Sequence, residues 1–144
     1  MDQDIIKIAR NFDMGAEPLK VARFGSGLIN DTYLVECNKD KYILQKLHSI
    51  FKPSVLIDTD NITRHLFING LKTPLLVKTR SDKLFFRDAK NNHWRMLTYI
   101  PGKCYEAGIR PEQAFKAGQL VGRFHNILSS FDYQFRHKIK NFYD

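Results

Sequence analysis

Between residues 20 and 47 the chain offers three β-rich segments separated only by short turns, and this pattern constrains the fold most. The segments are 20–24, 31–37 and 41–47, parted by a glycine-rich stretch and then by the polar turn 38–40. Short connections join antiparallel strands, whereas parallel strands need a crossover of about a dozen residues or more. The pattern therefore predicts three consecutive antiparallel strands.

The remaining segments alternate between helical and β periodicity. Apolar residues at helical spacing predict an opening helix over 5–12, a helix from 53 to 69 and a long helix over 112–130. β-rich runs predict further strands at 75–79, 84–88 and 94–100, before Pro101-Gly102 ends the sheet. We predict an α+β fold: a mostly antiparallel sheet of about five to six strands with one inserted helix, followed by the first helix of a second unit.

Composition excludes several classes of protein. With 43% hydrophobic residues among 144, the chain has enough apolar surface for a globular core. The net charge of +8 comes from scattered Lys and Arg without a nucleic-acid-binding motif, so we expect no nucleic-acid partner and favour an anionic small ligand. The N-terminal string MDQD is acidic, and no apolar run reaches the roughly 18 residues that a membrane span needs. We expect a cytoplasmic protein with no membrane partner.

The glycine-rich stretch between the first two predicted strands is the first candidate site. In the string FGSGLINDTY, glycines let backbone amides approach phosphate oxygens, and Ser26, Asn30 and Thr32 add polar groups. The alternative is a plain hairpin without a ligand. The string matches neither the P-loop nor the Rossmann fingerprint, each of which needs a following helix.

Five strings in order carry a resemblance to a known family: GSGLINDTYLVE, YILQKLH, DNITRHL, WRMLTYIPG and AGQLVGRFHNIL. From about Val21 to the end, the chain resembles the aminoglycoside phosphotransferase-type (protein-kinase-like) small-molecule kinases, most closely their N-acetylhexosamine 1-kinase branch. The resemblance implies that residues 1–100 form a kinase-like N-terminal nucleotide-binding lobe. It also implies that residues 101–144 form the hinge and the start of the C-terminal lobe, so that the chain is an N-terminal lobe fragment.

The resemblance implies a set of nucleotide-binding residues. The turn would cover the triphosphate through Gly25, Ser26, Gly27, Asn30 and Thr32, and the backbone of Thr98, Tyr99 and Ile100 would bind adenine. On the third strand Gln45 stands where the family has a phosphate-binding Lys, with Lys46 beside it on the opposite side of the sheet if pairing is regular. Either Gln45 takes the role, or a register shift brings in Lys46.

The inserted helix offers a further candidate. Asp60 stands where the family tends to have the Glu that orients the third-strand side chain. The alternative is that Asp58 and Asp60 are solvated charges on the helix surface.

The implied activity is transfer of the γ-phosphate of ATP to a hydroxyl of a small molecule, most plausibly a sugar such as an N-acetylhexosamine. ATP and Mg²⁺ are the implied cofactors. The family's H-x-D-x-x-x-x-N loop does not occur in the sequence, so we assign no catalytic residue and no metal ligand to this chain and expect it to be inactive alone. The alternative is a non-catalytic module that binds a polyanion or a partner chain. The apolar face of helix 112–130 also suggests a homo-oligomer.

Overall fold

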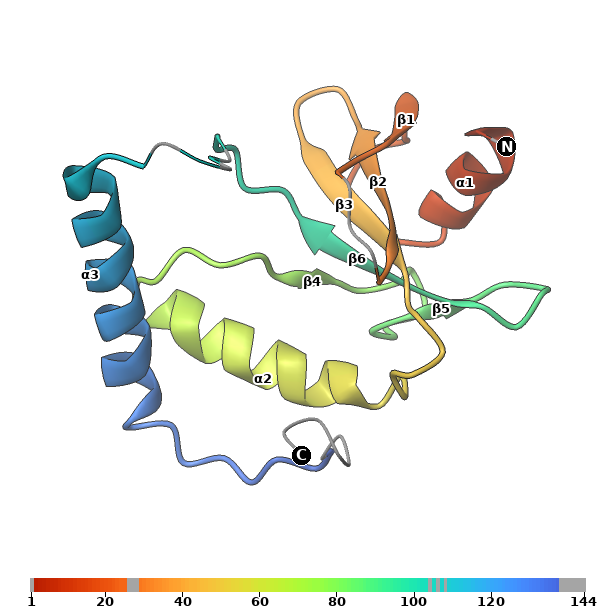
Figure 1. Ribbon diagram of the computed structural model, residues 1–144. Helices are drawn as coiled ribbons and strands as arrows, with labels where there is room; N and C mark the ends of the chain where they lie inside the picture. Colours follow the sequence, from red (N-terminus) through yellow and green to blue (C-terminus); the bar gives the residue numbers. More distant parts are fainter. Residues whose placement is uncertain (1, 26–28, 104, 106, 108, 138–144) are drawn as a thin grey trace.

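The structure is a computed structural model that describes residues 2–25, 29–103, 105, 107 and 109–137 (Figure 1). The elements in chain order are α1 (Asp2–Ala9), β1 (Lys20–Arg23), β2 (Asp31–Glu36), β3 (Lys41–Lys46), α2 (Val55–Ile68), β4 (Leu76–Val77), β5 (Phe86–Arg87), β6 (His93–Thr98) and α3 (Pro111–Leu128). They confirm the predicted α+β fold and the predicted order of helices and strands. Strands β4 and β5 are shorter than the sequence pattern predicted.

The strands form one antiparallel sheet in the order β1-β2-β3-β6-β4, and β5 pairs with β6. β3 therefore lies at the centre, between β2 and β6. Because side chains alternate along a strand, this register sends odd-numbered and even-numbered residues of β3 to opposite faces of the sheet. Ile43 pairs with Leu97, and Leu44 pairs with Met96.

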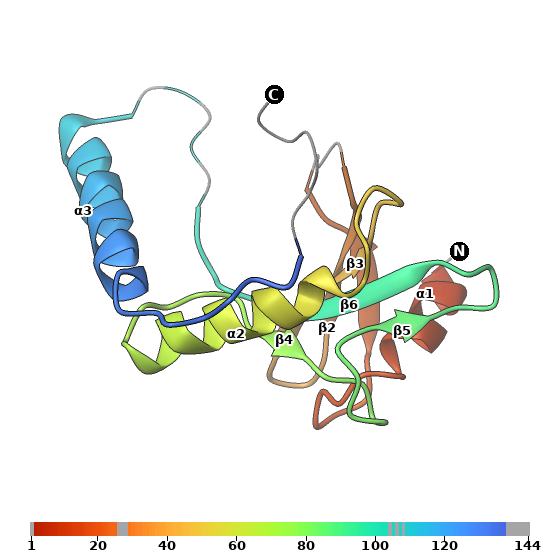
Figure 2. The same ribbon diagram turned by 90° about the horizontal axis from the view of Figure 1, so that it is seen from below.

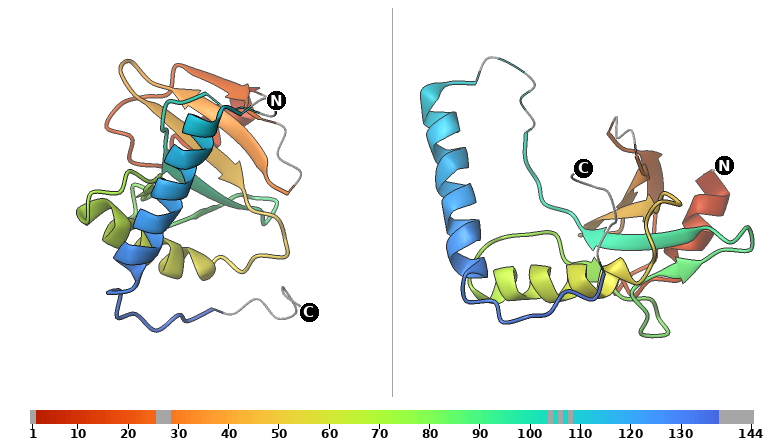
Figure 3. Two further views of the ribbon diagram at one scale, coloured as in Figure 1. Left: turned by 60° about the vertical axis from the view of Figure 1, so that its left-hand side comes forward. Right: turned by 60° about the horizontal axis from the view of Figure 1, so that its bottom comes forward.

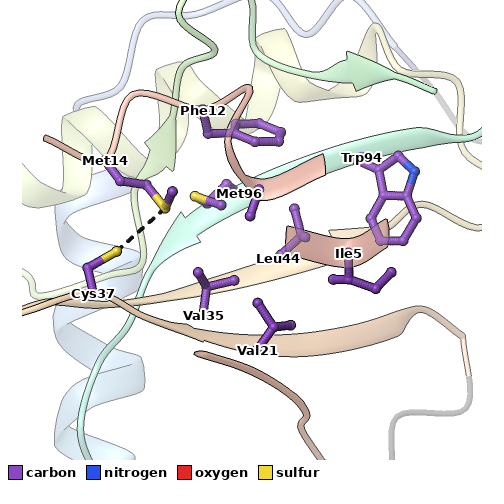
Figure 4. Packing of buried hydrophobic residues seen from close by; sticks show 10 residues of the cluster. Ile5, Phe12, Met14, Val21, Val35, Cys37, Leu44, Trp94 and Met96 are labelled. Carbon is purple, nitrogen blue, oxygen red and sulfur yellow. Dashed lines mark hydrogen bonds between the residues drawn. The ribbon is translucent and has the colours of Figure 1, made fainter. Parts of the chain in front are cut away.

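One face of the sheet carries the main core (Figure 4). Val35, Leu44 and Met96 are fully buried there, beneath α1 and the segment that follows it. Trp94 lies in the same core. Cys37 lies 3.9 Å from the sulfur of Met14, and burial raises the pKa of its thiol. The core thus fixes which face of β3 and β6 remains for other contacts.

Helix α2 covers the opposite face. Its Leu56 is fully buried and clusters with Leu47 and Leu76, while Leu97 of β6 packs against the same cluster. The helix ends before Gly70, whose φ of 76° is a left-handed conformation that an L side chain adopts only with strain. α2 therefore lies on the face that carries the odd-numbered residues of β3 and β6.

Helix α3 stands away from the sheet and meets α2 only near one end (Figures 2 and 3). Arg123 Nη2 donates to the carbonyl oxygen of Gly70 at 2.8 Å, and a ring nitrogen of His65 lies 3.1 Å from the carbonyl oxygen of Ile127. Val121 and Phe124, on the apolar face predicted for this helix, are exposed. Among the residues that the structure describes, no helix is long and apolar enough to cross a bilayer.

Candidate functional site

A small apolar cleft lies where β6 leaves the sheet. Its volume is about 350 Å³, and its lining comprises Phe24, Ile43, Pro74, Leu97, Thr98, Tyr99, Ile100, Gly102 and Lys103. Phe24 and Tyr99 meet edge to face across it, with ring centroids 6.1 Å apart. A larger hollow of about 560 Å³ lies beyond the other end of β3, but turn residues such as His48, Lys52 and Asn92 make its lining far more polar. The smaller cleft is the better match for a flat apolar ring.

The backbone beside this cleft is only partly free. Thr98 N–H donates to the carbonyl oxygen of Leu75 at 2.9 Å, and Tyr99 N–H donates to that of Lys41 at 3.2 Å. Within the described residues the N–H of Ile100 has no hydrogen-bond partner. Of the three residues predicted to contact adenine, only Ile100 therefore keeps an available backbone donor.

The glycine-rich turn comes directly before β2. Gly25 has a φ of 74°, a left-handed conformation that favours glycine, and Phe24 N–H donates to the carbonyl oxygen of Thr32 at 2.9 Å to close the base of the turn. The side-chain oxygen of Asn30 accepts from His48 N–H at 3.0 Å, so it fastens the turn to the loop after β3. Ser26 and Gly27 lie outside the described residues.

A row of polar side chains crosses three strands next to the cleft. Thr32, Gln45 and Arg95 are direct register partners on β2, β3 and β6. Arg95 Nε–H donates to Gln45 Oε1 at 3.0 Å, and Gln45 Nε2–H donates to Thr32 Oγ1 at 3.1 Å. Gln45 lies two residues after Ile43 and therefore shares its face, the face of the cleft.

The alternative between Gln45 and Lys46 is resolved geometrically, because the pairing of β3 is regular. Lys46 pairs in register with Trp94, on the face of the main core, and its Nζ lies 3.7 Å from Asp31 Oδ2. A register shift that brings Lys46 to the cleft face does not occur. Gln45 therefore lies on the cleft face and Lys46 on the face of the main core.

Sequence reasoning missed Arg95. The signal was present in β6, where the apolar residues Trp94 and Met96 alternate with Arg95 and Leu97. Once Trp94 is assigned to the core, period-two alternation sends Arg95 to the opposite face. The composition of that strand did not by itself say which of its two faces met the core.

The two helix acids of α2 differ in their surroundings. Asp60 forms an ion pair with Arg64 at 2.8 Å, and its Oδ1 is buried without a hydrogen-bond partner among the described residues. Among the described residues, Asp60 and Gln45 form no hydrogen bond, so the predicted orienting contact is not formed. The alternative of solvated charges does not hold for Asp58, which is buried.

Asp58 instead fastens the segment after α3. Its carboxylate accepts hydrogen bonds from the Tyr133 hydroxyl and from the backbone N–H groups of Arg136 and His137. Burial by itself would raise the pKa of Asp58, but these hydrogen bonds stabilise the charged form and hold the pKa below its ordinary value. Asp58, in the first turn of α2, thus has a structural role.

The antiparallel sheet, the helix on its cleft face and the glycine turn together form the fold of a kinase-like N-terminal lobe. Residues 20–142 match the sequence profile described as the phosphotransferase enzyme family. The chain belongs to this family.

Solved structures show the same fold. A microcompartment-associated aminopropanol kinase matches with a TM-score of 0.70 at 15% identity, over 94% of this chain and 44% of that one. Amicoumacin kinase, in complex with AMP-PNP, Ca²⁺ and its substrate, matches with a TM-score of 0.68 at 19% identity, over 92% and 41%. Spectinomycin phosphotransferase, in complex with ADP and spectinomycin, matches with a TM-score of 0.61 at 16% identity, over 88% and 38%. The chain spans less than half the length of each.

Proposed function

We propose that this chain is the ATP-binding portion of a kinase that phosphorylates a hydroxyl of a small molecule. The observation that carries the proposal is the cleft of about 350 Å³, which lies between the glycine turn and the hinge and is walled by Ile43 and Leu97. The unpartnered N–H of Ile100 supplies a donor beside these walls. An adenine ring needs such a combination of apolar faces and a backbone hydrogen bond.

The phosphates would lie toward the turn and the polar row. Gly25 has open space where a side chain would stand, with no atom within 4 Å of a Cβ built there. The backbone can therefore approach a phosphate closely, and Thr32 and Gln45 lie next along the same face. Spectinomycin phosphotransferase and amicoumacin kinase, which share the fold, hold ADP and AMP-PNP in their structures.

Mg²⁺ would neutralise charge on the transferred phosphoryl group. The described residues gather no group of three His, Cys, Asp or Glu side chains that would fit a metal ion. We therefore assign no metal ligand to them, and the carboxylates and amides that Mg²⁺ requires belong to the family's catalytic loop.

A cytoplasmic location follows from the proposed use of ATP and is part of this proposal.

The acceptor that we propose is a sugar such as an N-acetylhexosamine. The support is the resemblance of strings such as GSGLINDTYLVE and YILQKLH to that branch of the family. Neighbours of the same fold act on spectinomycin, amicoumacin and aminopropanol, so the fold itself does not select an acceptor. The proposal is tested by a phosphoryl-transfer assay with ATP on a protein that joins this lobe to the family's catalytic loop. If the acceptor is such a sugar, this protein should phosphorylate N-acetylhexosamines in preference to aminoglycosides and amino alcohols.

The exposed apolar face of α3 is a candidate surface for self-association. Val121 and Phe124, three residues apart on the same face of the helix, are exposed apolar residues, and Gly118 and Gly122 have nothing within 4 Å of a Cβ built on them. We propose that this face pairs with the same face of a second copy when the chain is alone in solution. Burial of apolar area is the driving force for such an association.

Nucleotide binding is tested by thermal unfolding with and without AMP-PNP. A bound ligand raises the melting temperature by mass action, so the wild-type chain should be stabilised increasingly as the AMP-PNP concentration rises. Gly25→Asp should abolish this shift, because it places a negative charge and a side chain in the phosphate turn.

Gly15→Asp is the matched control. Gly15 also has a positive φ, of 68°, and open space around it, but it precedes β1 and lies away from the cleft. This variant carries the same strain and the same charge and should keep the shift. Loss of the shift in both variants, or its absence from the wild type, would contradict the proposal. Binding of heparin or of a partner chain, without any nucleotide effect, would favour the alternative of a non-catalytic binding module.

A further inference from the structure

The structure contains a cation on the cleft face that the sequence pattern did not assign. The family places its phosphate-binding cation on the third strand, yet β3 presents Gln45 there. Directly opposite, Arg95 of β6 reaches the same spot from the neighbouring strand, with its Nε 3.0 Å from Gln45 Oε1. A positive charge is therefore present next to the expected position, carried by a different strand.

The guanidinium of Arg95 has donors to spare. Its Nε–H is used by Gln45, and within the described residues no carboxylate forms an ion pair with it and no acceptor meets its two terminal nitrogens. Those nitrogens are not among the buried side-chain atoms that lack a partner, so they remain open to solvent or ligand. Burial lowers the pKa of the Arg95 guanidinium. The group nevertheless stays charged, because the ordinary pKa of arginine is very high.

An unpaired, half-buried guanidinium is uncommon, because a buried charge is costly unless an opposite charge meets it. Its two free N–H₂ groups form a planar fork that suits two oxygens of one phosphate. The Nε–H of Arg95 donates to Gln45, and the Gln45 amide donates in turn to Thr32. These hydrogen bonds orient the guanidinium before any ligand binds. The chain of donors also fixes the Gln45 amide, since Arg can only donate.

Lys46 is the competing cation, and its position argues against it. It lies on the face of the main core and is already within 3.7 Å of Asp31. To reach the cleft face it would have to cross the sheet. Arg95 requires no such change.

We propose that Arg95 binds the phosphates of the nucleotide in this protein, and that Gln45 is the residue that positions it. This inference rests on the proposed function and adds that the cation has moved from the third strand to β6. It predicts that Arg95 contributes to the binding of phosphates and not of adenosine.

The test compares AMP-PNP and adenosine on three variants by isothermal titration calorimetry. Arg95→Met should weaken AMP-PNP binding by about tenfold or more, the effect of a hydrogen bond to a charged group, and leave adenosine binding unchanged. Arg95→Lys keeps the charge without the fork and should show a smaller loss. Arg80→Met is the control, because Arg80 is an exposed arginine paired with Glu17 and its loss changes the net charge equally.

A charge exchange separates the role in binding from a role in folding. Gln45→Lys combined with Arg95→Gln returns the cation to the third strand and should recover most of the AMP-PNP affinity lost in Arg95→Met. Far-ultraviolet circular dichroism of each variant reports whether the sheet is intact.

The outcomes are distinguishable. If the wild type binds AMP-PNP no more tightly than adenosine, or binds neither, the proposed function fails and this inference fails with it. If the wild type prefers AMP-PNP but Arg95→Met leaves that preference intact, the assignment of Arg95 is overturned while the proposed function stands. Equal loss of AMP-PNP and adenosine in Arg95→Met would show a structural role and would also overturn it.

Discussion

The carboxylate of Asp58 accepts a hydrogen bond of 2.7 Å from the hydroxyl of Tyr133, a residue 75 positions later in the chain. Through this contact, the segment that follows α3 returns to the side of α2 (Figures 1 and 2). The backbone N–H groups of Arg136 and His137 complete the shell around the carboxylate. One buried acid therefore joins helix α2 to the segment that follows α3.

Asp58→Asn should release this segment. The amide group of Asn turns a donor toward N–H groups that need an acceptor, so hydrogen exchange of the Arg136 and His137 amides should accelerate roughly tenfold, the scale of a hydrogen bond to a charged group. Asp132→Asn removes a negative charge from an exposed position in the same segment and should leave the exchange unchanged. Equal protection in Asp58→Asn and the wild type would contradict the assigned role.

The same acid predicts a pH dependence. The pKa of Asp58 in the folded protein is below its ordinary value near 3.8, so the folded state binds fewer protons there than the unfolded state. The stabilisation is complete above the unfolded value and is lost as the pH falls through the folded value. Urea unfolding between pH 7 and pH 3 should therefore show an acid-side loss of stability that is smaller in Asp58→Asn. An identical pH profile in the two proteins would argue against this linkage.

Gly118→Ala and Gly122→Ala should each stabilise this chain. Nothing lies within 4 Å of a Cβ at either position, and glycine in a helix interior costs about 1 kcal/mol relative to alanine. Urea unfolding should show a gain of up to that amount for each variant. Gly70→Ala is the contrasting variant, because a φ of 76° and the Arg123 side chain at 3.0 Å oppose a Cβ there, and it should be destabilising. Destabilisation by both α3 variants would mean that another surface closes on these glycines.

Self-association through α3 is tested by sedimentation velocity over a range of chain concentrations. Val121→Lys places a charge in the centre of the exposed apolar face and should shift the chain toward the monomer. Leu19→Lys removes an apolar side chain of similar exposure that precedes β1, 65% against 56% for Val121, and should have no such effect. A wild-type chain that stays monomeric at high concentration would contradict the proposed pairing.

The turn between β5 and β6 depends on Asp88. Its carboxylate accepts from the backbone N–H groups of Lys90 and Asn92 and from Trp94 Nε1, the last at 2.9 Å. Asp88→Ala should destabilise the protein by about 1–3 kcal/mol, because it leaves the donors of a half-buried turn without an acceptor. Trp94 is the sole tryptophan, so its fluorescence should shift to longer wavelength as the turn loosens. Asp40→Ala, in an exposed turn, is the control, and equal emission spectra for all three proteins would contradict the prediction.

Local patterns account for most of what could be predicted. Short turns at 24–31 and 38–40 predict antiparallel pairing of β1, β2 and β3. The spacing of apolar residues predicts helices α2 and α3. The extent of β4 and β5 was less predictable, because a strand only two residues long depends on what its neighbour offers. Strand length in such cases is decided by pairing rather than by propensity.

The candidate site divides in the same way. The order of residues singled out the glycine turn and residues 98–100, and it raised the alternative between Gln45 and Lys46 without deciding it. The face of β3 that meets the cleft, the position of Arg95 beside Gln45 and the burial of Asp58 required the tertiary structure. Alternation along a strand tells which residues share a face, whereas only packing against α1 and α2 decides which face becomes core and which faces the cleft.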